Sequence, residues 1–233
     1  MKLGSRRRLV ALAAGVLATQ AHAQEDRLRN DWASLRRYQA ENAALAPATD
    51  RVVFMGNSIT EAWARLFPTL FPGKPYVGRG ISGQTTPQML VRFRQDVIAL
   101  KPKAVVILAG TNDIAGNTGP STVEMIEDNI ASMADLARAN GIRPVLCSVL
   151  PVYDYPWKPG LEPAAKIMTL NAWMRDYAAR NGAIYVDFHS AMQDERHGLR
   201  AELTYDGVHV TEAGYRVMAQ LVERGIAQAL ASH

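Results

Sequence analysis

The chain has 233 residues, of which 48% are hydrophobic and 21% are charged, which suits one globular domain with a sizeable core. The formal net charge of +4 comes from Lys2, Arg6, Arg7 and Arg8, because the other 22 basic residues balance the 22 acidic ones. No block of like charge remains, so the composition argues against a nucleic-acid partner or an anionic membrane surface.

The first 23 residues have the three parts of a secretory signal peptide. A basic start, MKLGSRRR, precedes the apolar run LVALAAGVLAT, and the small-residue motif AHA stands just before Gln24. The apolar run is about half as long as the ~20 residues that span a bilayer, so we expect cleavage without stable membrane insertion. Ser5-Arg6-Arg7 faintly resembles a twin-arginine signal, and both export routes stay open. We expect a periplasmic or secreted mature protein.

Cys147 is the only cysteine, so the chain has no intrachain disulfide. It lies in the apolar run RPVLCSVLP, where a thiol usually packs as a small hydrophobic side chain. We expect a buried core residue here.

After the signal peptide, residues 24–233 are expected to form a single domain. An N-terminal helix is expected over 24–48, since apolar residues recur there at helical spacing. From residue 50 to 231, short apolar runs alternate with longer helical patterns. The runs predict strands at 51–56, 75–78, 104–110, 144–151 and 183–188. The other stretches predict helices near 59–67, 86–99, 121–140, 163–181 and 211–230.

The strand runs are continuous and rich in β-branched residues, which is typical of strands buried on both faces of a parallel sheet. Alternation of strands and helices gives right-handed crossovers, with helices on both sides of the sheet. We therefore predict an α/β fold, a three-layer sandwich around a parallel sheet.

Polar and small residues stand where the predicted strands end. Ser58 follows the first strand, GRGISGQTT at 78–86 follows the second, and Asn112 follows the third. Asp206 and His209 stand just before the last helix. Because ligands of open parallel sheets bind beyond the carboxyl ends of the strands, we expect these residues to share one site.

These residue types fit nucleophilic acyl transfer. A serine becomes a nucleophile when a neighbouring histidine takes its proton, and a carboxylate fixes the tautomer of that histidine. Ser58, His209 and Asp206 supply the three groups. A tetrahedral intermediate also needs donors for its oxyanion, and the candidates are the backbone N–H groups of Ser58 and Gly83 and the side-chain amide of Asn112.

Four segments carry a family resemblance: GNS at 56–58, ISG at 81–83, GTND at 110–113 and DGVH at 206–209. In order and spacing they resemble the four sequence blocks of the SGNH (GDSL-type) hydrolases. The GNSIT and DGVHVTEAGY forms are similar to bacterial acylhydrolases that resemble platelet-activating-factor acetylhydrolase. The resemblance implies a flavodoxin-like, five-stranded parallel sheet with strand order 2-1-3-4-5.

The resemblance also implies roles for single residues. Ser58 would be the nucleophile, with Asp206 and His209 completing a catalytic triad, and Gly83 and Asn112 would lie in the oxyanion hole with the Ser58 N–H. The chain departs from the usual blocks at two positions. Asn57 stands where aspartate is commoner, and Gly78 stands where asparagine is frequent. Both changes bear on local hydrogen bonds, and neither removes a catalytic group.

Other interpretations of the same residues exist. Ser58 could simply cap a helix, since serine is a preferred N-cap residue. Asp113, Asp206 and His209 are possible zinc ligands, but the chain has no paired-histidine spacing, and serine chemistry accounts for them without a metal. We therefore expect no metal and no cofactor.

Four aromatic residues near these motifs are candidates for lining an acyl or sugar pocket, with surface packing as the alternative. They are Trp63, Tyr153, Tyr155 and Trp157.

Together the residues predict a serine esterase that works through an acyl-enzyme. The absence of a long apolar lid in the sequence and the balanced charge favour short acyl groups, acetyl above all, on carbohydrates or other soluble alcohols. The alternatives are a lysophospholipase or thioesterase of the same superfamily, or a non-catalytic carbohydrate-binding module. The physiological ester and the oligomeric state stay open.

Overall fold

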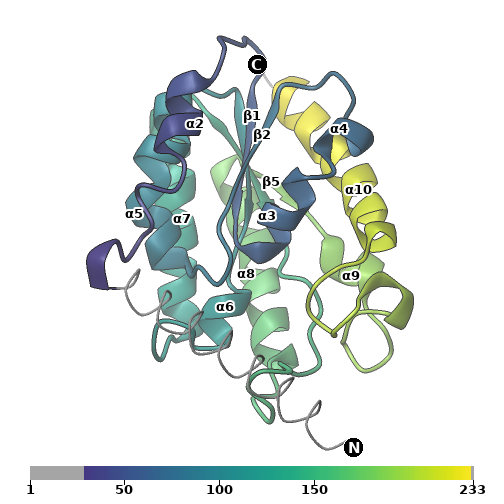
Figure 1. Ribbon diagram of the computed structural model, residues 1–233. Helices are drawn as coiled ribbons and strands as arrows, with labels where there is room; N and C mark the ends of the chain where they lie inside the picture. Colours follow the sequence, from purple (N-terminus) through teal and green to yellow (C-terminus); the bar gives the residue numbers. More distant parts are fainter. Residues whose placement is uncertain (1–28, 232–233) are drawn as a thin grey trace, which may run out of the picture.

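A computed structural model describes residues 29–231, so the predicted signal peptide lies outside the described residues. Five parallel strands form one sheet in the order β2-β1-β3-β4-β5, which confirms the predicted fold class and strand order (Figure 1). The strands are β1 (Val52–Gly56), β2 (Tyr76–Gly80), β3 (Ala104–Leu108), β4 (Arg143–Cys147) and β5 (Ile184–Val186).

Helices cover both faces of the sheet (Figure 1). One face carries α5 (Thr86–Asp96), α7 (Val123–Ala139) and α8 (Ala164–Asn181). The other face carries α3 (Ser58–Ala64), α4 (Phe67–Leu70), α9 (Phe188–Met192) and α10 (Glu212–Ala231). Shorter elements are α2 (Gln39–Ala44), α6 (Thr111–Ile114) and the 3-10 turns η1 (Ile98–Leu100) and η2 (Ala201–Leu203). Within residues 29–231, no helix has the length and apolarity to cross a membrane.

The central strands are buried on both sides, which explains their continuous apolar runs. In β1, Val53 and Met55 belong to the core under α5, α7 and α8, whereas Val52 and Phe54 belong to the core under α3 and α10. Cys147 ends β4 with no exposed surface, as expected. Burial raises the pKa of its thiol well above the ordinary range.

The predicted helix over 24–48 is wrong for most of its described length. Residues 31–38 form turns, and only α2 is helical between them and β1. The carboxylate of Asp31 accepts the backbone N–H groups of Leu35 at 2.7 Å and Arg36 at 3.0 Å, and Ser34 has a left-handed φ of 55°. Such local side-chain bonds compete with helix formation, and an apolar spacing pattern does not reveal them.

Residues 31–45, here called the N-terminal strap, pack against α5 and the edge strand β2. The Tyr38 hydroxyl donates to the Gly80 carbonyl at the end of β2. The amides of Gln88 and Gln95 on α5 donate to strap carbonyls at 2.6 and 2.5 Å. The strap therefore covers the edge of the sheet next to the site described below.

Candidate active site

Ser58 is the first residue of α3, directly after the carboxyl end of β1. The helix cap is Asn57, whose side-chain oxygen accepts the Ile59 N–H at 3.0 Å, so the capping interpretation of Ser58 is wrong. The Ser58 hydroxyl faces His209 instead, with 3.1 Å between its Oγ and Nε2 of the ring. The N–H groups of a first helical turn have no intrahelical partner, which leaves the Ser58 N–H available to a ligand.

Asp206 builds the turn that presents the histidine. Its Oδ1 accepts the backbone N–H groups of Val208 at 2.9 Å and His209 at 2.7 Å, and its Oδ2 lies 2.7 Å from Nδ1 of the imidazole. Gly207, with a φ of 86°, supplies the left-handed residue that this turn requires. The sequence D-G-V-H thus fixes the carboxylate–imidazole pair locally.

The electrostatics of this pair favour an ionised carboxylate. Partial burial raises the pKa of Asp206, but the N–H bonds from His209 and Val208 and the imidazole outweigh burial, so the net pKa is lowered. An ionised Asp206 accepts a proton-bearing Nδ1, which leaves Nε2 of His209 unprotonated beside the Ser58 hydroxyl.

Helix α10 holds the histidine turn against the serine helix. The Tyr215 hydroxyl, one turn into α10, donates to the Ile59 carbonyl at 2.8 Å. The Tyr215 ring stacks on Trp63 with 5.8 Å between centroids. Trp63 has no exposed surface, so the prediction that it lines a substrate pocket is wrong. It lies five residues after Ser58, about 140° around the helix, and therefore faces the core.

The loop after β2 and the turn after β3 are joined beside Ser58. Asn112 is buried, and its side-chain amide donates to the Gln84 carbonyl at 2.9 Å. Asn117 donates to the Gly83 carbonyl at 3.3 Å. The three candidate oxyanion donors therefore come from the carboxyl ends of the adjacent strands β2, β1 and β3.

The buried side chain of Arg92 connects the end of β1 with the loop after β2. Arg92 on α5 donates from Nε to the Gln84 side chain at 2.6 Å and from Nη2 to the Gly56 carbonyl at 3.1 Å. It also pairs with Asp96 at 3.0 Å, and both side chains are fully buried. One guanidinium thus links the end of β1 to the loop after β2.

Asp113 has a structural partner. Its carboxylate accepts the Thr86 N–H at 2.9 and 3.1 Å and the Thr86 hydroxyl at 2.6 Å. Burial raises its pKa to about 6, although the Thr86 bonds act in the opposite direction. Across residues 29–231, no three potential metal-ligating side chains gather into a cluster.

Of the loop aromatics, Tyr155 does not line a surface. It has no exposed area, and its hydroxyl donates to the Thr111 carbonyl at 2.8 Å, so the prediction of a substrate contact is wrong for it. Its hydroxyl supports the turn that carries Asn112. Trp157 is 46% exposed and lies 6.1 Å from the His209 ring. Tyr153 is also exposed, with the Arg196 guanidinium over its ring.

Tyr205 also contacts His209, although no motif in the sequence predicted it as a site residue. Its ring is 70% exposed and lies 5.8 Å from the His209 ring, with an angle of 11° between the planes. Its position directly before the D-G-V-H segment is the signal that could have identified it. Trp157 and Tyr205 thus place exposed aromatic surface beside the His209 ring.

Gly78 lies within β2, away from the strand end. A side chain there would overlap the Cβ of Ala64 on α3, so the departure from asparagine has a packing reason. The missing side chain at Gly78 allows α3 to lie close against the edge strand β2.

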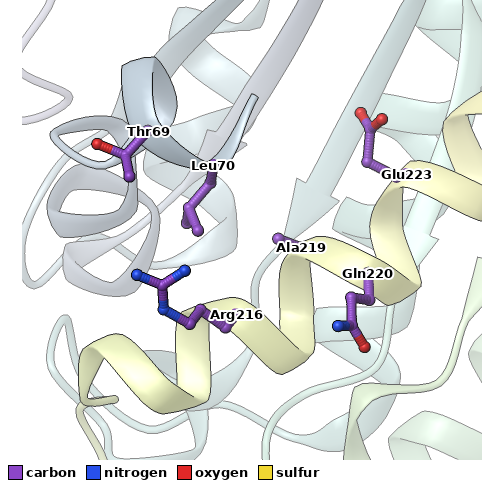
Figure 2. A pocket seen from close by; sticks show the side chains of 6 residues that line it. All are labelled: Thr69, Leu70, Arg216, Ala219, Gln220 and Glu223. Carbon is purple, nitrogen blue, oxygen red and sulfur yellow. The ribbon is translucent and has the colours of Figure 1, made fainter. Parts of the chain in front are cut away.

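A separate groove of about 400 Å³ runs between α4 and α10 (Figure 2). In Figure 2, Arg216 reaches from α10 toward the α4 segment. The groove is lined by Thr69, Leu70, Arg216, Ala219, Gln220 and Glu223. These residues include none of the predicted site residues, so the groove is distinct from the Ser58–His209 site.

The chain matches a known protein family over most of its length. Residues 54–217 match the GDSL-like Lipase/Acylhydrolase family, which is more than half of the chain. The chain therefore belongs to this family and is a carboxylic ester hydrolase.

Similar structures come from several bacteria. A GDSL-like lipase from Bacteroides thetaiotaomicron is 48% identical, with a TM-score of 0.83 over 86% of this chain and 100% of that chain. A variant of an acetyl-xylooligosaccharide esterase from Geobacillus has a TM-score of 0.61 over 77% of this chain and 94% of that chain. At 20% identity, it shows the shared fold alone.

One curated relative is similar over a shorter stretch. The lipoprotein YqeF of Bacillus subtilis is 33% identical over 98 residues, and the match spans 40% of each chain.

Proposed function

We propose that Ser58, His209 and Asp206 form the catalytic triad of this esterase. The observation that carries the proposal is the continuous set of contacts from serine to carboxylate. Ser58 Oγ lies 3.1 Å from Nε2 of His209, and Nδ1 of the same ring lies 2.7 Å from Asp206. This is the order of nucleophile, base and orienting carboxylate that acyl transfer needs.

The reaction then has two halves. Ser58 Oγ attacks the ester carbonyl while its proton passes to Nε2 of His209. The oxyanion receives hydrogen bonds from the N–H groups of Ser58 and Gly83 and the Asn112 amide. Collapse breaks the ester bond, and the alcohol leaves with the proton from His209. Water gives a proton to His209 and attacks the acyl group, and the second collapse releases the acid and reprotonates Ser58.

For the acyl group, we propose acetyl or a similarly short chain. A cavity of about 10 Å³ lies beneath the serine turn, at the ends of β1, β3 and β4. It is lined by Asn57, Ile59, Leu108, Ala109, Thr111, Val149 and Leu150. Ser58 itself does not line this cavity, which is a void of about one water-sized probe next to the serine turn and offers no channel for a long acyl chain.

For the alcohol, we propose a carbohydrate. Trp157 and Tyr205 expose flat aromatic surface next to His209, where the leaving alcohol must lie. The C–H face of a sugar ring packs well on such surfaces, because an aromatic face carries partial negative charge. The Geobacillus esterase shares only the fold, so the exposed aromatic side chains carry this part of the proposal.

We also propose that the protein is exported after removal of residues 1–23. The basic and apolar pattern of that segment supports export, as does the similarity to a bacterial lipoprotein. N-terminal sequencing of the protein recovered from periplasm and medium tests this. A mature chain that begins at Gln24 is expected, and an intact Met1 in the cytoplasmic fraction would contradict it.

The test of the function uses the mature chain and p-nitrophenyl acetate, butyrate and octanoate. We expect acetate to be hydrolysed fastest and Ser58→Ala to be inactive. Ser132→Ala, a half-buried serine on α7 whose hydroxyl donates to the Asp128 carbonyl, is the control and should match the wild type. Faster hydrolysis of octanoate would favour a lysophospholipase or thioesterase. Activity in Ser58→Ala would place the nucleophile elsewhere. Sugar binding without any hydrolysis would favour a binding module.

A further inference from the structure

The turn that carries Gly83 is anchored by the buried residues Ile81 and Gln84, but at Gly83 itself no side chain contributes packing. Gly83 has a left-handed φ of 77°, and no atom lies within 4 Å of the point where a Cβ would stand. The orientation of this peptide unit therefore depends on hydrogen bonds, among them the Gln84 N–H to the Ile81 carbonyl at 3.2 Å. The bonds made by residues 82–84 must fix the direction of the Gly83 N–H.

One of these bonding partners is a carboxylate from the serine helix. Oε2 of Glu61 accepts the backbone N–H of Ser82 at 2.9 Å and the Ser82 hydroxyl at 2.5 Å. On the far side of Gly83, Asn117 binds its carbonyl and Asn112 binds the Gln84 carbonyl. Glu61 thus fixes the loop immediately before Gly83, and the two asparagines fix it immediately after.

Glu61 lies on α3 between the Gly83 loop and Arg37 of the N-terminal strap. It lies three residues after Ser58, so the two side chains project from the same side of α3. Its side chain is only 22% exposed, and its other carboxylate oxygen faces Nη2 of Arg37 in the strap at 3.6 Å. One oxygen therefore binds the loop, while the second is held by a cation.

We infer that Glu61 is a positioning residue that holds the Gly83 N–H in the oxyanion hole. The inference rests on the proposed function. Glu61 couples the two oxyanion donors, because the same short helix begins with the Ser58 N–H and holds the Gly83 loop through Glu61. Charged acceptors form stronger hydrogen bonds than neutral ones, which suits a turn that contains a glycine.

If Glu61 has this role, its loss should affect kcat and KM differently. A misdirected Gly83 N–H weakens stabilisation of the oxyanion, which exists only in the transition state and the tetrahedral intermediate. Ground-state binding and proton transfer to His209 do not depend on it. Loss of Glu61 should therefore lower kcat while KM and the pH dependence of kcat stay the same.

The experiment compares Glu61→Ala and Glu61→Gln with Glu41→Ala in the mature protein. Glu41 also pairs with Arg37, at 3.1 Å, and does not bind the loop, so it is a matched control for lost charge. With p-nitrophenyl acetate, we expect a kcat loss of about 10- to 100-fold for Glu61→Ala. A smaller loss is expected for Glu61→Gln, whose amide oxygen still accepts a bond. A boronic acid that forms a tetrahedral adduct on serine should lose affinity in parallel with kcat.

The outcomes separate this inference from the proposed function. An inert wild type, or an active Ser58→Ala, means that the proposed function fails. If the triad holds but Glu61→Ala retains kcat within twofold, or changes only KM, the inference is overturned. A kcat loss without loss of boronic-acid affinity also overturns it. Should Glu61→Ala fail to fold, the isosteric Glu61→Gln carries the same comparison.

Discussion

At the scale of single residues, the site depends on side chains that each serve two purposes. Asp206 binds two backbone N–H groups of its own turn and the imidazole of His209. Asn57 caps α3 and so leaves the hydroxyl of Ser58 to face the histidine. Removing either side chain changes local backbone structure and the chemistry of the neighbouring residue together.

Asp206→Asn should lower kcat for p-nitrophenyl acetate by about 10²- to 10⁴-fold. An amide still accepts the backbone bonds, but it neither stabilises an imidazolium nor selects the tautomer with the proton on Nδ1. The control is Asp187→Asn, which alters a half-buried carboxylate that caps α9. Circular dichroism checks that both variants fold. A loss below tenfold would contradict the role of Asp206.

The buried carboxyl of Asp113 should make stability depend on pH. Its folded pKa of about 6 exceeds the ordinary 3.8, so the folded state binds more protons between these values. Its contribution is therefore full below pH 3.8 and is lost as pH rises through 6. Urea denaturation should show the wild type losing about 2 kcal/mol relative to Asp113→Asn between pH 4 and 7. An unchanged difference would mean that Asp113 ionises normally.

At the scale of elements, the position of Ser58 is set by how closely α3 approaches β2. Gly78 and Gly80 on β2 face α3 without a side chain between them. Tyr215 of α10 bonds the first turn of α3 from the other side. The proposed nucleophile therefore stands on a helix that is fixed by an edge strand and by the helix that follows the histidine.

Gly80→Ala should displace α3, because the new methyl group would overlap backbone atoms of Asn57, Thr60 and Glu61. Backbone cannot move aside as a flexible side chain does. We expect the free energy of unfolding to fall by about 2–3 kcal/mol, with a loss of kcat from the displaced serine. Urea unfolding and esterase kinetics measure the two effects. An unchanged free energy of unfolding would show that α3 can move away from β2 without loss of stability.

The elements also show what the sequence can predict. The strands and core helices followed from continuous apolar runs and from amphipathic spacing, since burial dictates both. The helix over 24–48 failed because Asp31 bonds its own backbone, which residue spacing does not reveal. Trp63 and Tyr155 stand near the motifs in sequence but point into the core, because direction depends on helix rotation and on the fold of a long loop.

At the scale of the whole molecule, one sheet separates two cores and presents all site segments at its carboxyl edge. The order of the strands brings the loops after β2, β1 and β3 together, although they are distant along the chain. Cys147 lies at the carboxyl end of β4, in the core under α3 and α10. Its exposure requires the sheet and its helices to separate.

Cys147 should therefore report global unfolding. It is the only thiol, it is fully buried, and burial raises its pKa, so it should not react with a disulfide reagent in the native protein. In urea, the labelling rate should rise in step with the loss of circular dichroism. Fast labelling without denaturant would mean that β4 opens locally.

The most direct test of the account is to trap the nucleophile. A p-nitrophenyl phosphonate ester transfers its phosphonyl group to an activated serine, and digestion with trypsin then yields the peptide 52–65 between Arg51 and Arg65. We expect one adduct per chain, on Ser58 within this peptide, and no adduct in Ser58→Ala or His209→Ala. Mass spectrometry that finds the adduct on another peptide, or none in an enzyme that hydrolyses esters, would contradict the triad.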